Sequence, residues 1–137
     1  MGVDFKHGCM SYARYDRFVC VLAKSFGGKP NIYIPDFSPN ENGEVFIYPF
    51  GFIECGENNN VKEKFTFDIE VPEVIVKYCN APYGELKLEE TKELYHIMNK
   101  NRNQLLSHES DDDSGTVDQI IKEFWHYTDD GVGWYTL

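Results

Sequence analysis

Positive charge is scarce in this chain of 137 residues. It holds 13 lysines and arginines against 23 aspartates and glutamates, which gives a net charge of −10 and a pI of about 4.7. A surface of one dominant negative sign repels phosphate backbones instead of attracting them. The composition therefore disfavours direct binding to nucleic acid.

Long hydrophobic runs are also missing. The longest apolar stretch, residues 45–53, is interrupted by Pro49 and Gly51, whereas a membrane helix needs roughly 20 apolar residues. No cationic stretch precedes an apolar run at the N-terminus, so we expect no secretory signal. Lys6 stands where a myristoylation pattern wants Ser or Thr. We expect a soluble, cytoplasmic protein with no membrane partner.

Motifs for cofactors and catalysis are missing as well. The four cysteines, Cys9, Cys20, Cys55 and Cys79, form no C-x-x-C pair, so we expect reduced and mostly buried thiols. There is no glycine-rich phosphate loop, because Gly27-Gly28 follows a helical pattern instead of preceding one. We therefore expect no cofactor and no metal, and the sequence favours a non-enzymatic role.

Apolar and aromatic side chains are plentiful by contrast. Hydrophobic residues make up 42% of the chain, with 10 Phe, 9 Tyr and 2 Trp, and such side chains supply large areas for burial. The length suits one domain with a core of its own. We expect a single domain over residues 1–137.

Three segments have the apolar spacing of amphipathic helices. The first begins with a cap at Ser11 and ends at Gly27-Gly28, and the second covers residues 88–106. The third begins with a cap at Thr116 and ends before Asp129. Residues 73–79 fit either a strand, because of their β-branched run, or a short helix, because a proline precedes them.

Short β-branched and aromatic runs occupy residues 30–71. We expect strands at residues 31–34, 45–53 and 64–71, turns at 40–43 and 57–60, and an ordered final strand or packed arm at 132–137. This order predicts an α+β fold: an antiparallel β meander of three to four strands, with one N-terminal helix and two C-terminal helices packed on one face.

Negative charge is concentrated at the C-terminal end, where residues 105–137 hold eight acidic side chains and one basic one. Acids beside aromatic side chains are typical of surfaces that bind a basic partner. An equally weighted interpretation is a solvated loop and helix face. The candidate partner-binding residues are Glu109, Asp111, Asp112, Asp113, Asp118, Glu123, Trp125, Tyr127, Asp129, Asp130, Trp134 and Tyr135.

Two other interpretations stay open. Tyr12, Arg14, Tyr15 and Arg17 are a candidate site for an anionic small molecule or a nucleotide, because arginine binds anions and tyrosine stacks. Such side chains also commonly surround the edge of a core. A weaker alternative is a metal-dependent hydrolase that uses Asp and His, although the acids from Asp111 onward do not fit the EF-hand pattern.

The favoured hypothesis is a small acidic module that binds a basic protein, for example a nucleic-acid-binding one, and occludes its basic surface. In size and charge the chain resembles the small acidic inhibitors of mobile elements and toxin systems, such as immunity, anti-restriction or anti-CRISPR proteins, with no shared motif. The helical C-terminal third could serve equally for self-association, so a homo-oligomer stays an alternative.

Overall fold

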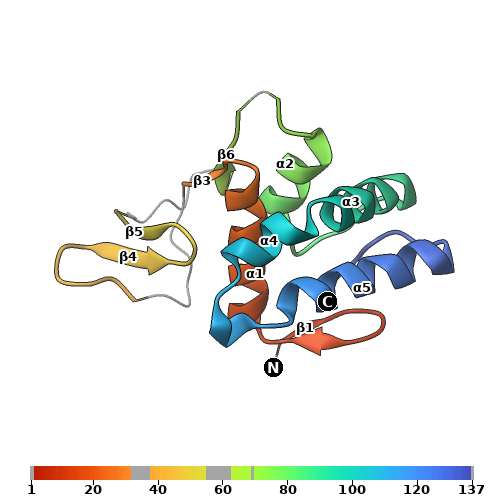
Figure 1. Cartoon of the computed structure of the whole chain (residues 1–137), viewed down its shortest axis with the longest axis horizontal. Coiled ribbons are helices and arrows are strands. Elements are labelled where there is room, and N and C mark those ends of the chain that lie inside the picture. The colour runs from red at the N-terminus through yellow and green to blue at the C-terminus, as the bar shows by residue number, and fades with distance from the viewer. Residues whose placement is uncertain (1, 32–37, 55–62, 69, 137) are drawn as a thin grey trace.

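A computed structural model describes residues 2–31, 38–54, 63–68 and 70–136, which form a helical body with short strand pairs at its edges (Figure 1). The helices are α1 (Tyr12–Ser25), α2 (Glu73–Asn80), α3 (Leu88–Lys100), α4 (Arg102–His108) and α5 (Thr116–Asp130), with a 3-10 turn η1 (Asp111–Asp113). The strands are β1 (Val3–Asp4), β2 (Cys9–Met10), β3 (Lys29–Pro30), β4 (Glu44–Ile47), β5 (Gly51–Glu54) and β6 (Phe65–Thr66).

Helix α1 confirms the helix predicted after Ser11. The Ser11 hydroxyl accepts a hydrogen bond from the Arg14 backbone N–H at 3.2 Å, which satisfies one of the unpaired donors of the first turn. At the other end Gly27 adopts a φ of 75°, a left-handed conformation that costs glycine little. One stripe of α1, with Tyr15, Phe18 and Leu22, is buried in the core.

The segment at 73–79, which the sequence left open between strand and helix, is helix α2. Pro72 precedes it, where a missing N–H costs nothing. Val74, Ile75, Tyr78 and Cys79 face the core at helical spacing. Burial of this stripe decides the conformation, since its β-branched residues alone would suit a strand.

The predicted helix at 88–106 is in fact two helices, α3 and α4, which meet at Asn101. The Asn101 side chain donates a hydrogen bond to the Ile97 carbonyl at 2.8 Å, and its backbone leaves helical geometry. A side-chain amide that binds a backbone carbonyl competes with the helix ladder. The break lets α3 pack against α5 while α4 packs against α1.

The predicted meander of three to four strands is wrong, and so is the arrangement of one N-terminal and two C-terminal helices. The described strands form three separate antiparallel pairs, β1 with β2, β3 with β6, and β4 with β5. Residues 45–53 are a hairpin instead of one strand, with Val45 opposite Ile53 and Phe46 opposite Phe52. Pro49 has no N–H to give to a ladder, so the apolar run turns there.

The other strand predictions fare unequally. The turn at 40–43 is confirmed, because the Asn40 side chain accepts hydrogen bonds from Asn42 and Glu44 at 2.9 Å. The predicted strand at 64–71 pairs only at Phe65–Thr66, and residue 69 lies outside the described residues. Residues 32–34 and the turn at 57–60 also lie outside them.

A single cluster of buried side chains joins α1, α2, α3, α5 and the C-terminal arm. The predicted arm is ordered over residues 132–136, and residue 137 lies outside the described residues. Trp134 stacks on Phe124 with ring centroids 3.9 Å apart, and its backbone N–H donates to the Thr91 hydroxyl at 2.8 Å. Stacked aromatic rings bury large areas and fix the packing of the arm.

In the part of the chain that the structure describes, no helix has the length and apolar character needed to cross a membrane.

Candidate functional site

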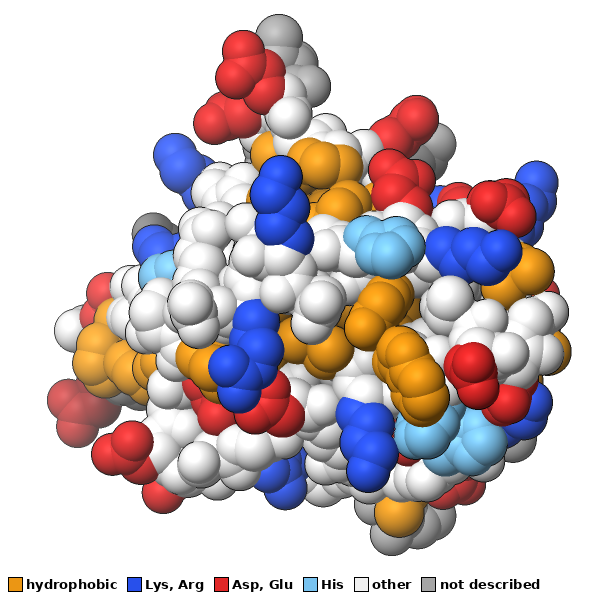
Figure 2. All heavy atoms as spheres, turned by 45° about the vertical axis from the view of Figure 1, so that its right-hand side comes forward, with side chains coloured by type: hydrophobic (Ala, Val, Ile, Leu, Met, Phe, Trp, Pro, Cys, Tyr) orange, Lys and Arg blue, Asp and Glu red, His pale blue; other side chains and the backbone are white. Residues whose placement is uncertain are grey.

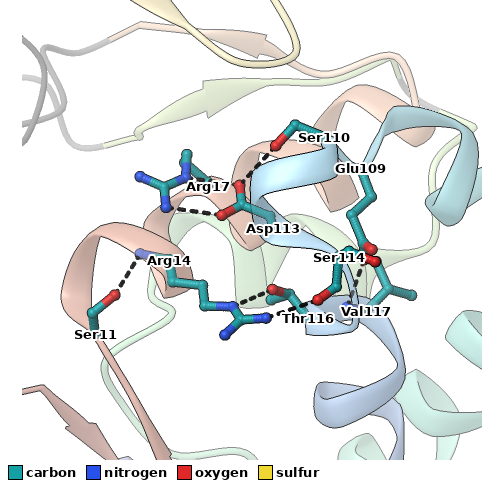
Figure 3. Close-up of polar contacts among 9 residues, drawn as sticks. All are labelled: Ser11, Arg14, Arg17, Glu109, Ser110, Asp113, Ser114, Thr116 and Val117. Atoms are coloured by element: carbon teal, nitrogen blue, oxygen red, sulfur yellow. Dashed lines mark hydrogen bonds and ion pairs between the residues drawn. The ribbon is translucent and has the colours of Figure 1, made fainter.

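The acidic run after α4 is held against α1 by an ion pair (Figure 3). Arg17 donates two parallel hydrogen bonds to the Asp113 carboxylate, Nε to Oδ2 at 2.7 Å and Nη2 to Oδ1 at 2.8 Å. Asp113 is only 4% exposed, and the Ser110 hydroxyl donates a third hydrogen bond to it at 3.3 Å. A bidentate, largely buried pair of this kind is structural.

Arg14 and Glu109 also hold the acidic run against α1 and α5 (Figure 3). We call this region, residues 109–116 with Arg14 and Arg17, the acidic junction. Arg14 donates to the Thr116 hydroxyl and, at 3.0 Å, to the Ser114 carbonyl. The Glu109 carboxylate accepts from the backbone N–H groups of Gly115 and Val117, both at 2.9 Å. Thr116 is therefore not the cap predicted from the sequence. Gly115 has no side chain to offer, so Glu109 binds the free donors at the start of α5 instead.

The candidate anion-binding residues of α1 thus contact the candidate partner-binding acids directly. Arg14 and Arg17, candidates for binding an anion, hold the junction that contains Asp113 and Thr116. Tyr15 is fully buried, and its hydroxyl contacts the Tyr78 hydroxyl at 2.8 Å and the Pro82 carbonyl at 2.6 Å. Burial raises the pKa of Tyr15 well above its usual value. Only Tyr12 of this set is exposed.

Two more acids of the C-terminal run have cationic partners. Asp118 accepts from Arg102 at 2.6 and 2.9 Å, which lowers the pKa of its carboxyl. Asp130 contacts His7 at 2.8 Å and Lys6 at 3.1 Å, and hydrogen bonds from both lower its pKa. These pairs join distant parts of the chain, α4 to α5 and the β1–β2 loop to the end of α5.

Glu123 is buried, with 5% of its surface exposed. Desolvation by burial raises the pKa of its carboxyl, and the His7 backbone has a smaller, lowering effect on that pKa. Its Oε2 atom has no hydrogen-bond partner among the described residues. Glu123 is therefore not accessible to a partner.

Three acids of the predicted set remain exposed with no ion pair in the described ranges: Asp111, Asp112 and Asp129. Of the four aromatic candidates, Tyr127 and Trp134 lie in the core, while Trp125 is 44% exposed and Tyr135 is also exposed. Figure 2 shows lysine and arginine side chains between the acidic ones on the face it draws. The charge on that face is mixed, although the chain carries −10 in total.

The β4–β5 hairpin presents an aromatic pair that the sequence analysis did not single out. Phe46 and Phe52 lie opposite each other with centroids 5.3 Å apart and are 45% and 63% exposed. Val45 and Ile47, on the other side of β4, are buried. The alternation of residues 44–47 was the available signal, but the expectation of one long strand concealed the pairing.

The hairpin lies beside α1 and α4, with its turn facing them (Figure 1). Lys24 of α1 places its Nζ 5.5 Å from the centroid of the Phe50 ring in that turn. The pKa of Tyr48 is raised, first by desolvation and then by the charges of Asp113, Glu109 and Asp111. Tyr48 lies two residues after Phe46, so the charges of the acidic junction reach the turn of the hairpin.

Residues that could bind metal are dispersed. In the stretches that the structure describes, no three His, Cys, Asp or Glu side chains are arranged to hold a metal ion. Cys20 and Cys79 are buried as expected and Cys9 is exposed, while Cys55 lies outside the described residues.

Comparison with family models, with curated proteins and with solved structures found no match.

Proposed function

We propose that this chain is a protein-binding module that docks on a basic surface of another protein in the cytoplasm and occludes it, as an inhibitor of the immunity or anti-defence type. The observation that carries the proposal is the exposed Phe46–Phe52 pair on a hairpin whose turn contacts Lys24 of α1 and is influenced by the charges of Asp113, Glu109 and Asp111. Exposed aromatic side chains are typical anchors of protein interfaces, and acids around them complement the charge of a basic partner.

The magnitudes suit such an interface. A phenylalanine can bury roughly 150–250 Å², so the exposed parts of Phe46 and Phe52 together offer about 200 Å². At about 25 cal/mol per Å² their burial contributes about 5 kcal/mol before the entropy cost of association. The exposed carboxylates of Asp111 and Asp112 add little to affinity but accelerate encounter with a cationic surface.

The experiment that tests the proposal is affinity capture with matched baits. Wild-type protein is compared with F46S/F52S and D111N/D112N, and with D4N/E85Q, which removes two exposed acids elsewhere. A basic protein retained by wild type and D4N/E85Q at about 50 mM salt, and shed at about 500 mM salt, supports the proposal. Retention of the same proteins by F46S/F52S contradicts it.

Kinetics with the captured protein then separate the two contributions. We expect F46S/F52S to speed dissociation, because it removes buried apolar contacts. We expect D111N/D112N to slow association at low salt and to leave dissociation nearly unchanged. The alternative of binding an anionic small molecule has no specific observation in its favour, because both candidate guanidinium groups already hold protein acceptors.

A further inference from the structure

Two pockets that share Glu73 adjoin at the first turn of α2. This helix lies at the top of Figure 1. The first pocket has a volume of about 450 Å³. Its apolar lining comes from Phe65, Phe67, Val71 and Val76. Its charged lining comes from Glu63, Asp68 and Glu73, all of them exposed carboxylates.

The second pocket, of about 520 Å³, shares Glu73 with the first and lies between α2 and α3. It adds Glu90 and Glu93, together with Lys77. The Lys77 ammonium contacts Glu90 at 2.6 Å and lowers the pKa of that carboxyl. The two pockets together therefore hold five carboxylates and one lysine, and that lysine is already paired.

The remaining four carboxylates have no cationic partner among the described residues: Glu63, Asp68, Glu73 and Glu93. Lys64 is next to Glu63 in the chain, but its ammonium lies over the Tyr83 ring, 5.7 Å from the centroid. These four carboxylates thus form no ion pair among the described residues, in contrast to Asp113, Asp118 and Asp130 of the C-terminal run, which all do.

We propose that these adjoining pockets receive a cationic, amphipathic segment of the partner protein, an inference that rests on the proposed function. An apolar side chain of the segment packs on Phe67 and Val76 while its lysines or arginines meet the carboxylates around them. The exposed carboxylates leave the pockets open to solvent, whereas small-molecule sites enclose most of their ligand. A peptide segment therefore fits this surface better than a small organic cation.

The test uses a labelled peptide with the sequence KLKKLLKK and two control peptides, KKKKKKKK and ELEELLEE. Binding to the full chain is measured by fluorescence anisotropy at low salt, and amide shifts are followed by NMR. We expect KLKKLLKK to bind about tenfold more tightly than the lysine octamer, because only the former can use the apolar lining. The largest amide shifts should fall at residues 64–68 and 73–77.

Matched variants separate this site from general electrostatic attraction. E63Q/D68N/E73Q and D111N/D112N/D129N each remove three exposed charges, so both change the net charge equally. We expect about a tenfold loss of affinity in the first and less than about twofold in the second. V76T, which makes the lining polar without altering charge, should lose about threefold.

Three results would overturn the pocket assignment. They are equal losses in the two triple variants, equal binding of the octamer, and amide shifts centred on residues 111–113. None of them touches the proposed function, which is decided by capture with the F46S/F52S bait. Conversely, peptide binding at the pockets together with unchanged capture by F46S/F52S supports the pockets and refutes the hairpin as the docking surface.

Discussion

Asp112 and Asp113 are neighbours in one acidic run, yet the structure assigns them opposite roles. Asp113 is buried against Arg17, whose side chain is 28% exposed, whereas Asp112 is exposed. Breaking a fully buried pair from one side costs about 3–5 kcal/mol. Because solvent reaches Arg17, the cost here should be smaller, and we expect Asp113→Asn to lower the free energy of unfolding by about 2 kcal/mol. Asp112→Asn should stay within about 0.5 kcal/mol of wild type.

Urea unfolding followed by tryptophan fluorescence measures both variants, because Trp134 is stacked in the core and reports its loss. When Arg17 is already replaced by Met, Asp113→Asn should lower the free energy of unfolding by at least about 1 kcal/mol less than it does in the wild type. The reason is that no unpaired arginine is then left behind. Equal stability of the two single variants would refute the assignment of Asp113 to the fold, and the acidic run would again be a uniform surface.

Glu109→Ala should lower the free energy of unfolding by about 1 kcal/mol in the same urea assay, because it frees the Gly115 and Val117 donors at the start of α5. The pKa of Glu123 is raised above its usual 4.5, so the wild type gains stability from its proton below that value and loses it as the pH rises through the folded pKa. Glu123→Gln removes this titration. The melting temperature of the variant minus that of wild type should therefore increase as the pH is raised from about 4 to about 7. A difference that does not change with pH would contradict the burial of this carboxylate. F46S/F52S should melt within a few degrees of wild type, because both rings are exposed, and a large loss would show that the pair stabilises the fold.

The helices were the part of the fold most open to prediction. Helix α1 has a capping serine, an apolar stripe and a glycine stop within one short window, so local chemistry suffices. The ambiguous segment at 73–79 depended on distant partners instead, since the Tyr78 hydroxyl meets that of Tyr15 in the core. No local pattern shows such a contact.

The strands were harder to predict because their pairings are short. Residues 45–53 are the longest apolar stretch, but the turn at residues 48–50, which contains Pro49, divides it into two strands. The α+β class follows from composition and element order alone, whereas the pairing of β3 with β6 joins residues on either side of a long intervening segment.

Charge density along the sequence was a poor guide to charge available on the surface. The counter-ion of Asp113 is Arg17, which lies 96 residues away in the sequence. From the sequence, Arg17 was a candidate for binding an anionic small molecule instead. The carboxylates near α2 that form no ion pair among the described residues come from the separate positions 63, 68, 73 and 93, and no short stretch of sequence contains them. Ion pairing between distant segments decides which acids remain free.

We propose that this chain binds a basic protein through the exposed aromatic pair of its hairpin. Parallel capture with wild-type and F46S/F52S baits at about 50 mM salt tests it most directly. We expect the proteins that wild type retains and the variant loses to be predominantly basic. Identical sets of retained proteins on the two baits would contradict it.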